Sequence, residues 1–329
     1  MSQARRRQFL IATISLATLD LSAHAQTKLR VRQIGYLSQA SAEVNVSRLA
    51  AFRAGMTDLR WIEGRDYSLD ARYANGVMHA LPGLAAALVA AGPDLLLVPS
   101  DEDVRLLAQS TKTIPIVFVI AQDPIGNGLA ASLSRPRGNA TGLTTISTEL
   151  SSKRLQLLKE AFPRVSHIVL LFEPDNVGSV SQAKEIGAVA SRLKVRITPI
   201  ELRQPSDIEP AFKQASAIGA QAFIVTTGGT IASQRQAIAD RLIRLKTPAM
   251  FANSQWAEAG GLMSYGPSFT DNFHRAAAYV DKILKGAKPG EIPIEQPTKF
   301  ELIVNMKTAR LSHYAFPESF LTQVNRVIE

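Results

Sequence analysis

The sequence contains no cysteine. That absence excludes disulfide bonds, thiolate metal sites and a cysteine nucleophile. It also excludes the acylated cysteine of a lipoprotein, so we expect a protein that is not anchored to a membrane. Aromatic residues make up 6% of the chain, and beyond its first residues no basic run is interleaved with them. The net charge of +9 is therefore attributed to solvated helix faces, and no nucleic-acid partner is expected.

The chain also lacks a hydrophobic run long enough to span a bilayer. The apolar run Phe9 to Leu19 has eleven residues, whereas a spanning helix needs about 20. Arg5-Arg6-Arg7 precedes it and Ala23-His24-Ala25 follows it, as in a secretory signal peptide. We predict that residues 1–25 are a signal peptide cleaved after Ala25, and that the mature protein is periplasmic. Because Arg6-Arg7-Gln8-Phe9-Leu10 also fits the twin-arginine pattern, the export route stays open.

Catalytic motifs are sparse. There is no Gly-x-Ser-x-Gly elbow and no Gly-Lys-Ser/Thr phosphate loop, and the histidines are scattered without the spacing of a metal site. Gly126 to Ala131 matches the loose dinucleotide pattern but follows the fourth strand, so a helix-start turn explains it better. The pairs Asp101/Asp103 and Glu173/Asp175 suit acid–base chemistry but serve equally as helix caps. We expect no metal, no cofactor and no enzymatic activity.

Short apolar segments alternate with helical patterns along the whole chain. Leu95–Val98 and Ile116–Val119 are apolar on both faces, which is typical of parallel strands covered by helices on both sides. The alternation predicts an α/β fold with doubly wound parallel sheets. We predict strands at 31–37, 67–73, 94–99, 114–121, 140–146, 168–172, 195–202, 222–227, 248–253, 262–266 and 300–304, and a helical piece after them.

Two parts of the chain resemble each other. Gly92–Val98 resembles Gly219–Val225, and Thr113–Phe118 resembles Lys246–Phe251. Because both pairs fall at matching places in the order of strands and helices, two similar lobes are expected in tandem.

The turns after the predicted strands are rich in short polar side chains. In open α/β sheets a ligand lies beyond the carboxyl ends of the strands, and two lobes with such rims enclose a cleft for a small polar solute. Each residue could instead cap a helix or form a turn. The predicted ligand-binding residues are Tyr36, Ser38, Ser100, Asp123, Thr144, Glu173, Asp175, Thr227, Asn253 and Tyr265, with the two tyrosines as apolar walls.

Several segments share the pattern of one protein family. They include Phe52-Arg53-Ala54-Gly55-Met56, Asp123-Pro124-Ile125-Gly126-Asn127-Gly128-Leu129, Gly260-Gly261-Leu262-Met263-Ser264-Tyr265-Gly266 and Gln296-Pro297-Thr298-Lys299-Phe300-Glu301-Leu302. They resemble a large family of bacterial ABC transporter substrate-binding proteins that includes tryptophan- and tyrosine-type binders. The resemblance implies the type-I periplasmic-binding-protein fold, with three hinge crossings and a ligand between the lobes. It implies an N-terminal lobe of 26–143 plus 265–298, a C-terminal lobe of 144–264 plus 299–329, and a monomer that serves an ABC permease.

The resemblance makes an aromatic amino acid the default ligand. Two departures from the family pattern, Ser100-Asp101-Glu102-Asp103 and Glu173-Pro174-Asp175-Asn176, add carboxylates to the rims. These favour a cationic or neutral polar solute as a rival. A ligand sensor or receptor subunit of the same fold is the alternative function, although its DNA-binding relatives would carry a helix-turn-helix where this sequence has only the leader. An α/β enzyme is the other alternative.

Overall fold

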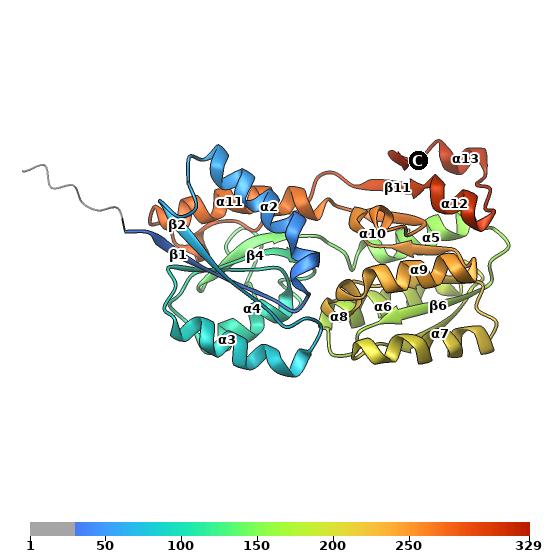
Figure 1. The fold of residues 1–329 in the computed structure, drawn as a ribbon, viewed down its shortest axis with the longest axis horizontal. Helices are drawn as coiled ribbons and strands as arrows, with labels where there is room; N and C mark the ends of the chain where they lie inside the picture. Colours follow the sequence, from blue (N-terminus) through green and yellow to red (C-terminus); the bar gives the residue numbers. More distant parts are fainter. Residues whose placement is uncertain (1–29) are drawn as a thin grey trace, which may run out of the picture. The chain divides into compact units, whose positions relative to one another are not determined.

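The structure is a computed structural model, and it describes residues 30–329. The predicted signal peptide, residues 1–25, lies outside the described residues. Residues 32–329 form two α/β lobes, each built on its own sheet (Figure 1). The first sheet has the order β2-β1-β3-β4-β5, and all of its strands are parallel. These strands are β1 (Arg32–Ser38), β2 (Tyr67–Tyr73), β3 (Leu95–Val98), β4 (Ile116–Ala121) and β5 (Ala140–Thr144).

Helices cover both faces of the first sheet. In Figure 1, α2 (Ala42–Asp58) and α11 (Phe269–Leu284) lie side by side on one face, although more than 200 residues separate them in the sequence. The 3-10 turn η1 (Met78–Ala80), α3 (Leu81–Ala90) and α4 (Asp101–Ser110) lie on the other. Alternate residues of β3 face opposite sides, Leu95 and Leu97 toward α2 and α11, and Leu96 and Val98 toward α3 and α4. This burial explains why the strand is apolar throughout.

The second sheet has the order β12-β11-β10-β9-β8-β6-β7. Its strands are β6 (His167–Phe172), β7 (Arg196–Glu201), β8 (Ala222–Val225), β9 (Ala249–Phe251), β10 (Met263–Gly266), β11 (Glu301–Asn305) and β12 (Arg326–Ile328). All of its pairs are parallel except β10 with β11. Its helices are α5 (Leu150–Ala161), α6 (Val177–Ala190), α7 (Ile208–Ala217), α8 (Gly229–Ser233), α9 (Arg235–Leu245), α10 (Ser254–Glu258), α12 (Met306–Ser312) and α13 (Glu318–Leu321), with the 3-10 turn η2 (Pro205–Asp207). The 3-10 turn η3 (Pro289–Glu291) packs beside β5 in the first lobe.

The chain passes between the lobes three times. It leaves the first sheet after β5, returns between β10 and α11, and leaves again between the bridge of Glu295 to Leu143 and the start of β11. The domain limits drawn from the sequence stay predictions, with two differences. Thr144 pairs with Ala121 in the first sheet, so it does not belong to the second lobe. Tyr265 and Gly266 pair with Leu302 and Glu301 in the second sheet, so these two residues do not belong to the first lobe.

A buried arginine ties the hinge segments together. Arg154, on α5, is 1% exposed and donates to main-chain oxygens of three separate segments. Its Nη1 lies 2.9 Å from Ser147 O in the first crossing, its Nε lies 2.8 Å from Tyr265 O in β10, and its Nη2 lies 3.4 Å from Ala252 O after β9. Because a buried guanidinium is costly without partners, these carbonyls fix the position of α5 beside the crossings.

The predicted fold class, two doubly wound parallel-sheet lobes, is confirmed. The antiparallel pairing of β11 was not anticipated, and the end of the chain forms α12, α13 and the short strand β12 where only a helical piece was expected. Within residues 30–329, no helix combines the length and apolar character needed to cross a membrane.

Candidate functional site

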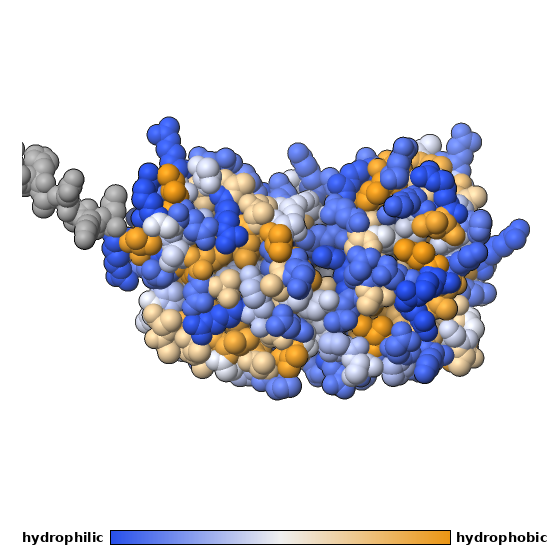
Figure 2. All heavy atoms as spheres, viewed as in Figure 1, coloured by the Kyte–Doolittle hydropathy of each residue, from blue (hydrophilic) through white to orange (hydrophobic). Residues whose placement is uncertain are grey.

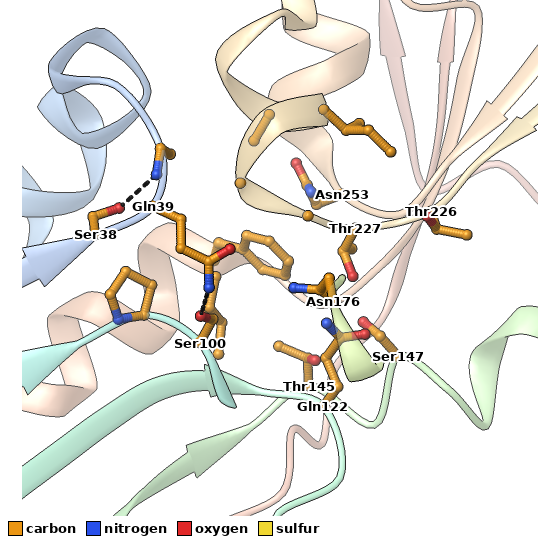
Figure 3. Close-up of a pocket in the computed structure, with 18 of the residues that line it drawn as sticks. Ser38, Gln39, Ser100, Gln122, Thr145, Ser147, Asn176, Thr226, Thr227 and Asn253 are labelled. Atoms are coloured by element: carbon orange, nitrogen blue, oxygen red, sulfur yellow. Dashed lines mark hydrogen bonds between the residues drawn. The ribbon is translucent and has the colours of Figure 1, made fainter. Parts of the chain in front are cut away.

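A cavity lies between the carboxyl ends of the two sheets. The first lobe contributes the turns after β1, β3 and β4, and the second lobe contributes the turns after β8 and β9 and the start of α6. Water-sized molecules can be centred in about 50 Å³ of it, several times the roughly 10–15 Å³ that one water needs. Figure 3 shows its polar lining, which includes Ser38, Gln39, Ser100, Gln122, Thr145, Ser147, Asn176, Thr226, Thr227 and Asn253.

On the first lobe, three side chains form a hydrogen-bonded row. Ser100 caps α4 and donates its hydroxyl to Asp103 Oδ2 at 2.8 Å. Gln39 Nε2 donates to the same hydroxyl oxygen at 2.8 Å (Figure 3). Because the Ser100 hydrogen goes to Asp103, Gln39 must present its amide nitrogen to Ser100. Gln39 Oε1 and Asp103 Oδ1 are then left without partners among the described residues, although both atoms are buried.

The second lobe contributes neutral polar groups. Gln182 Nε2 donates to Thr227 Oγ1 at 2.6 Å, and the hydroxyls of Ser179 and Thr226 lie 2.6 Å apart. Asn253 starts α10 without capping it through its side chain, and within residues 30–329 its buried Oδ1 has no hydrogen-bond partner. This wall thus offers hydroxyl and amide groups but no charge of its own.

Apolar and aromatic side chains form the remaining walls. Trp256, at the start of α10, stacks on Phe251 with ring centroids 4.5 Å apart. Phe269, at the start of α11, lies under the guanidinium of Arg48 at 5.5 Å. With Pro99 and Ile120, these side chains complete the lining. A ligand with a flat apolar part can pack against Trp256 and Phe269 while its polar part meets the strand-end turns.

The rims of the two lobes touch through hydrogen bonds. Glu102 of α4 accepts from Asn176 Nδ2 at 2.8 Å and from the Val177 amide at 2.7 Å, both at the start of α6. Arg48 of α2 donates to Gln255 Oε1 from Nε at 3.3 Å and from Nη2 at 3.2 Å. Along the junction of the lobes, the face shown in Figure 2 is mostly hydrophilic. These contacts are polar, as expected of surfaces that separate and rejoin.

Two glycines of the second lobe face two glutamines of the first. A Cβ at Gly229 would overlap Gln39 Cβ, and a Cβ at Gly178 would overlap the amide of Gln122. At both places the two lobes lie so close together that the second lobe has no room for a side chain.

Three buried carboxyl groups around the cavity are harder to ionise than usual. Burial raises the pKa of Asp103 to about 7 and that of Asp101 to about 6, against hydrogen bonds from Ser100 and from the Gln122 amide respectively that lower them. Burial likewise raises the pKa of Glu173 to about 8, although backbone amides of α8 act in the opposite direction. Burial lowers the pKa of Arg48 to about 10. A lone buried charge is costly, and a ligand of opposite charge would offset that cost.

The structure brings four of the ten predicted residues to the cavity: Ser38, Ser100, Thr227 and Asn253. Glu173 lies directly behind Gly228, facing the amides of α8, and Thr144 is buried next to the lining residue Thr145, with its hydroxyl 3.2 Å from the Ile146 amide. Both sit one layer behind the lining.

The other four predicted residues do not line the cavity. Tyr36 is fully buried in the core of the first lobe, where its hydroxyl donates to Asn45 at 2.6 Å, and Tyr265 packs on the core of the second lobe. Asp123 accepts from the Gly126 amide in its own turn, and Asp175 pairs with Arg203 on the surface. These placements correct the prediction, because alternate strand residues point into the core and a turn residue can satisfy its own turn.

Sequence reasoning missed several lining residues. Gln39, Asp103 and Trp256 belong to turns that were singled out, but the choice within each turn depends on side-chain direction. Arg48 and Phe269 lie inside helices that pack against the rim from the first lobe, and no local pattern distinguishes them from ordinary helix residues. Among the residues that the structure describes, no group of three or more histidine or acidic side chains is placed to hold a metal ion.

Comparison with known proteins matches the model of the family "ABC transporter substrate binding protein" over residues 46–328. The chain belongs to this family. It is 24% identical, over 79% of its length and 74% of the relative's, to the tyrosine-binding protein of Clostridioides difficile (strain R20291). Its fold is similar to a conserved domain protein of Vibrio cholerae, with a TM-score of 0.83 and 22% identity, covering 91% of this chain and 100% of the other.

A second solved structure is similar to the same extent. It is the ABC domain of Streptococcus pneumonia in complex with L-Trp, with a TM-score of 0.81 and 24% identity, covering 91% of this chain and 100% of the other. The fold is thus that of the type-I periplasmic binding proteins, and the family is one of substrate-binding proteins rather than enzymes.

Proposed function

We propose that this chain is the exported solute-binding component of an ABC importer. It captures a small polar solute that bears an amino group, an amino acid or a related amine, and it catalyses no reaction. The observation that carries the proposal is the cavity itself. It is enclosed by strand-end turns of two lobes, and four buried polar atoms of its lining, Gln39 Oε1, Asp103 Oδ1, Ser147 Oγ and Asn253 Oδ1, have no partner among the described residues. A bound solute would supply the missing hydrogen bonds.

The walls and the relatives support an aromatic or other flat apolar part of the ligand. Trp256 of the second lobe and Phe269 of the first both line the cavity. The relatives named above are a tyrosine-binding protein and a complex with L-Trp. The site residues we propose are therefore Ser38, Gln39, Ser100, Asp103, Thr227 and Asn253 as polar contacts, with Trp256 and Phe269 as apolar ones.

Export and delivery complete the proposal. The order of basic, apolar and small residues in 1–25 supports cleavage after Ala25 and a periplasmic mature protein that acts as a monomer. Closure about the three crossings would enclose the solute, and an ABC permease would receive it from the closed form. The rims that touch in this structure support such a hinge motion, because polar contacts between them can be broken without exposing a core.

Native mass spectrometry of protein isolated from the periplasm tests this function directly. We expect a small molecule to travel with the folded protein and to be released on unfolding, and titration calorimetry to give one site per chain. Small-angle scattering should show a smaller radius of gyration at saturation. Turnover of the bound molecule, or a mature chain that binds nothing and still begins at Met1, would contradict the proposal.

A further inference from the structure

The buried side-chain atoms of the cavity lining that lack a hydrogen bond to the described residues are oxygens of amide, carboxyl and hydroxyl groups. Of the buried, unpartnered side-chain atoms in the described chain, the cavity lining holds the oxygens of Gln39, Asp103, Asn253 and Ser147. The two unpartnered nitrogens, Asn127 Nδ2 and Arg241 Nε, belong to residues outside the lining. An occupant that satisfies such a site must bring hydrogen-bond donors.

One of these acceptors belongs to a carboxyl group, and a neighbouring cation would favour its ionised form. Asp103 is 0% exposed, and its Oδ2 already accepts from the hydroxyl and the amide of Ser100 at 2.8 and 3.2 Å. Its Oδ1 has no hydrogen-bond partner among the described residues. Gln39 Oε1, also without a partner among them, belongs to the amide that donates to the same Ser100 hydroxyl. A protonated amino group supplies three donors and the compensating charge.

Groups that could bind a ligand carboxylate are already engaged by this chain's own side chains. Glu173 Oε1 accepts from the Ile231 amide in the first turn of α8 at 2.5 Å, and the amides of Gly229 and Thr230 act on the same carboxylate. Glu102 takes the Val177 amide that starts α6. Arg48, the cationic residue of the lining, directs Nε and Nη2 to Gln255 on the opposite lobe. Carboxyl groups of this chain thus occupy the N-termini of α6 and α8, which could otherwise attract an anion.

We propose that the cleft selects an organic cation: a primary amine with a flat apolar body and no carboxylate, whose ammonium group binds Asp103 Oδ1 and Gln39 Oε1. This inference rests on the proposed solute-binding function and narrows its ligand class. It assigns Asp103 and Gln39 the recognition of the ammonium group. It leaves the carboxylate of an amino acid without a free helix N-terminus at α6 or α8, because Glu102 and Glu173 already accept from the amides at the starts of these two helices.

Calorimetric titration with three compounds that share one body tests the assignment. These are tryptamine, L-tryptophan and tryptophol, with tyramine against L-tyrosine and agmatine against L-arginine as further pairs. We expect the best amine to bind at least 10-fold more tightly than its amino acid and its alcohol. Asp103→Asn should weaken that amine about 10- to 100-fold, the effect of losing one hydrogen bond to a charged group.

Matched variants separate recognition from folding. Asp101→Asn changes a carboxyl group that is equally buried in the same first turn of α4 but does not line the cavity, and it should leave amine affinity within about twofold, below the effect of one charged hydrogen bond. Gln39→Met should weaken the amine and removes one hydrogen bond to the Ser100 hydroxyl, while the bond from that hydroxyl to Asp103 is kept. Melting curves of the ligand-free variants show whether each is folded before its affinity is compared.

The outcomes are distinguishable. Tighter binding of the amino acids, with the gain lost in Arg48→Met, would overturn the inference and assign the carboxylate to Arg48. Equal binding of tryptophol, or capture of a neutral solute alone in the mass spectrum, would also overturn it while leaving the solute-binding function standing. Absence of any bound molecule in both experiments would remove the proposed function, and the inference with it.

Discussion

Two buried arginines, one at the hinge and one at the cleft, have different hydrogen-bond partners and therefore different roles. Arg154 at the hinge donates to main-chain oxygens of three segments. Arg48 at the cleft donates to one side chain, Gln255, on the opposite lobe. Burial lowers the pKa of Arg154 to about 9 and that of Arg48 to about 10, so the desolvation of the two groups is similar. Only their partners differ.

The choice of partner decides which process each arginine opposes. Carbonyls of the polypeptide chain are held by the strands and crossings that carry them, so Arg154 loses them only when the fold is lost. Gln255 moves away with its lobe, so Arg48 loses it each time the cleft opens. The hinge arginine therefore contributes to stability, and the cleft arginine contributes to the balance between open and closed forms.

Removing the hinge arginine should produce the largest effect on stability. Arg154→Met leaves three carbonyls without their donor, and we expect the free energy of unfolding to fall by about 1–3 kcal/mol for each carbonyl that stays buried and unsatisfied. Urea unfolding of the ligand-free protein measures it. Arg48→Met is the matched control and should cost clearly less. Equal losses in the two variants would break the comparison.

The pH dependence of the free energy of unfolding should give the second-largest effect, and it reports on the cleft rather than on the hinge. Glu173 has an ordinary pKa of 4.5, raised by burial to about 8, so between these values the folded protein binds its proton more tightly than the unfolded chain does. Stability should therefore fall as the pH rises through this window, by at most about 1.4 kcal/mol per pH unit for this group. Urea unfolding at pH 5.5, 6.5 and 7.5 should show a shallower fall in Glu173→Gln. A slope that the substitution leaves unchanged would refute the assignment.

The contact between Arg48 and Gln255 should influence ligand affinity more than stability. Gln255→Ala removes hydrogen bonds to a charged group that exist only while the rims touch. A loss of about 1.5–3 kcal/mol in closure corresponds to about 10- to 100-fold weaker binding. Calorimetry with the co-purified solute measures it, and the unfolding midpoint without ligand should hardly move. A large drop in that midpoint with affinity retained would show that this contact stabilises the fold, as the contacts of Arg154 do.

The smallest effect is expected from a neutral wall residue of the second lobe. Thr227→Val keeps the shape of the side chain and removes one hydroxyl, so affinity should fall by about 1 kcal/mol, or roughly 5-fold. Thr198→Val is the control and should bind normally. Thr198 is on β7, where its hydroxyl lies 2.9 Å from His167 Nε2 of β6. Comparable losses in both variants would show that the measured change reflects the fold rather than the site.

Most of the fold could be predicted from the sequence, because strands that are buried on both faces are apolar at every position. Leu95–Val98 and Ile168–Leu171 are of this kind, and their spacing along the chain reveals two lobes. The edge of the second sheet could not be predicted, because whether β11 runs parallel or antiparallel to β10 depends on where the chain returns, not on local pattern.

The site could be predicted to the level of the turn but not of the side chain. Ser38 and Tyr36 lie on the same strand end, two residues apart, yet Ser38 lines the cavity while Tyr36 fills the core. Both residues face the same side of β1, so their position along the strand distinguishes them: Ser38 ends the strand at the edge of the cavity, and Tyr36 lies two residues deeper in the lobe. Arg48 and Phe269 reach the cavity from helices that meet only in the folded chain, so tertiary packing alone identifies them.

The glycines that face Gln39 and Gln122 allow the two lobes to close because a glycine has no side chain. A methyl group at Gly229 would overlap Gln39 Cβ and wedge the lobes apart at the rim, whereas one at Gly178 would meet the end of the flexible Gln122 side chain, which can move aside. A side chain at Gly229 would hold the cleft partly open and leave both sheets and the hinge unaltered. The depth to which the two lobes close is therefore set by a position that has no side chain.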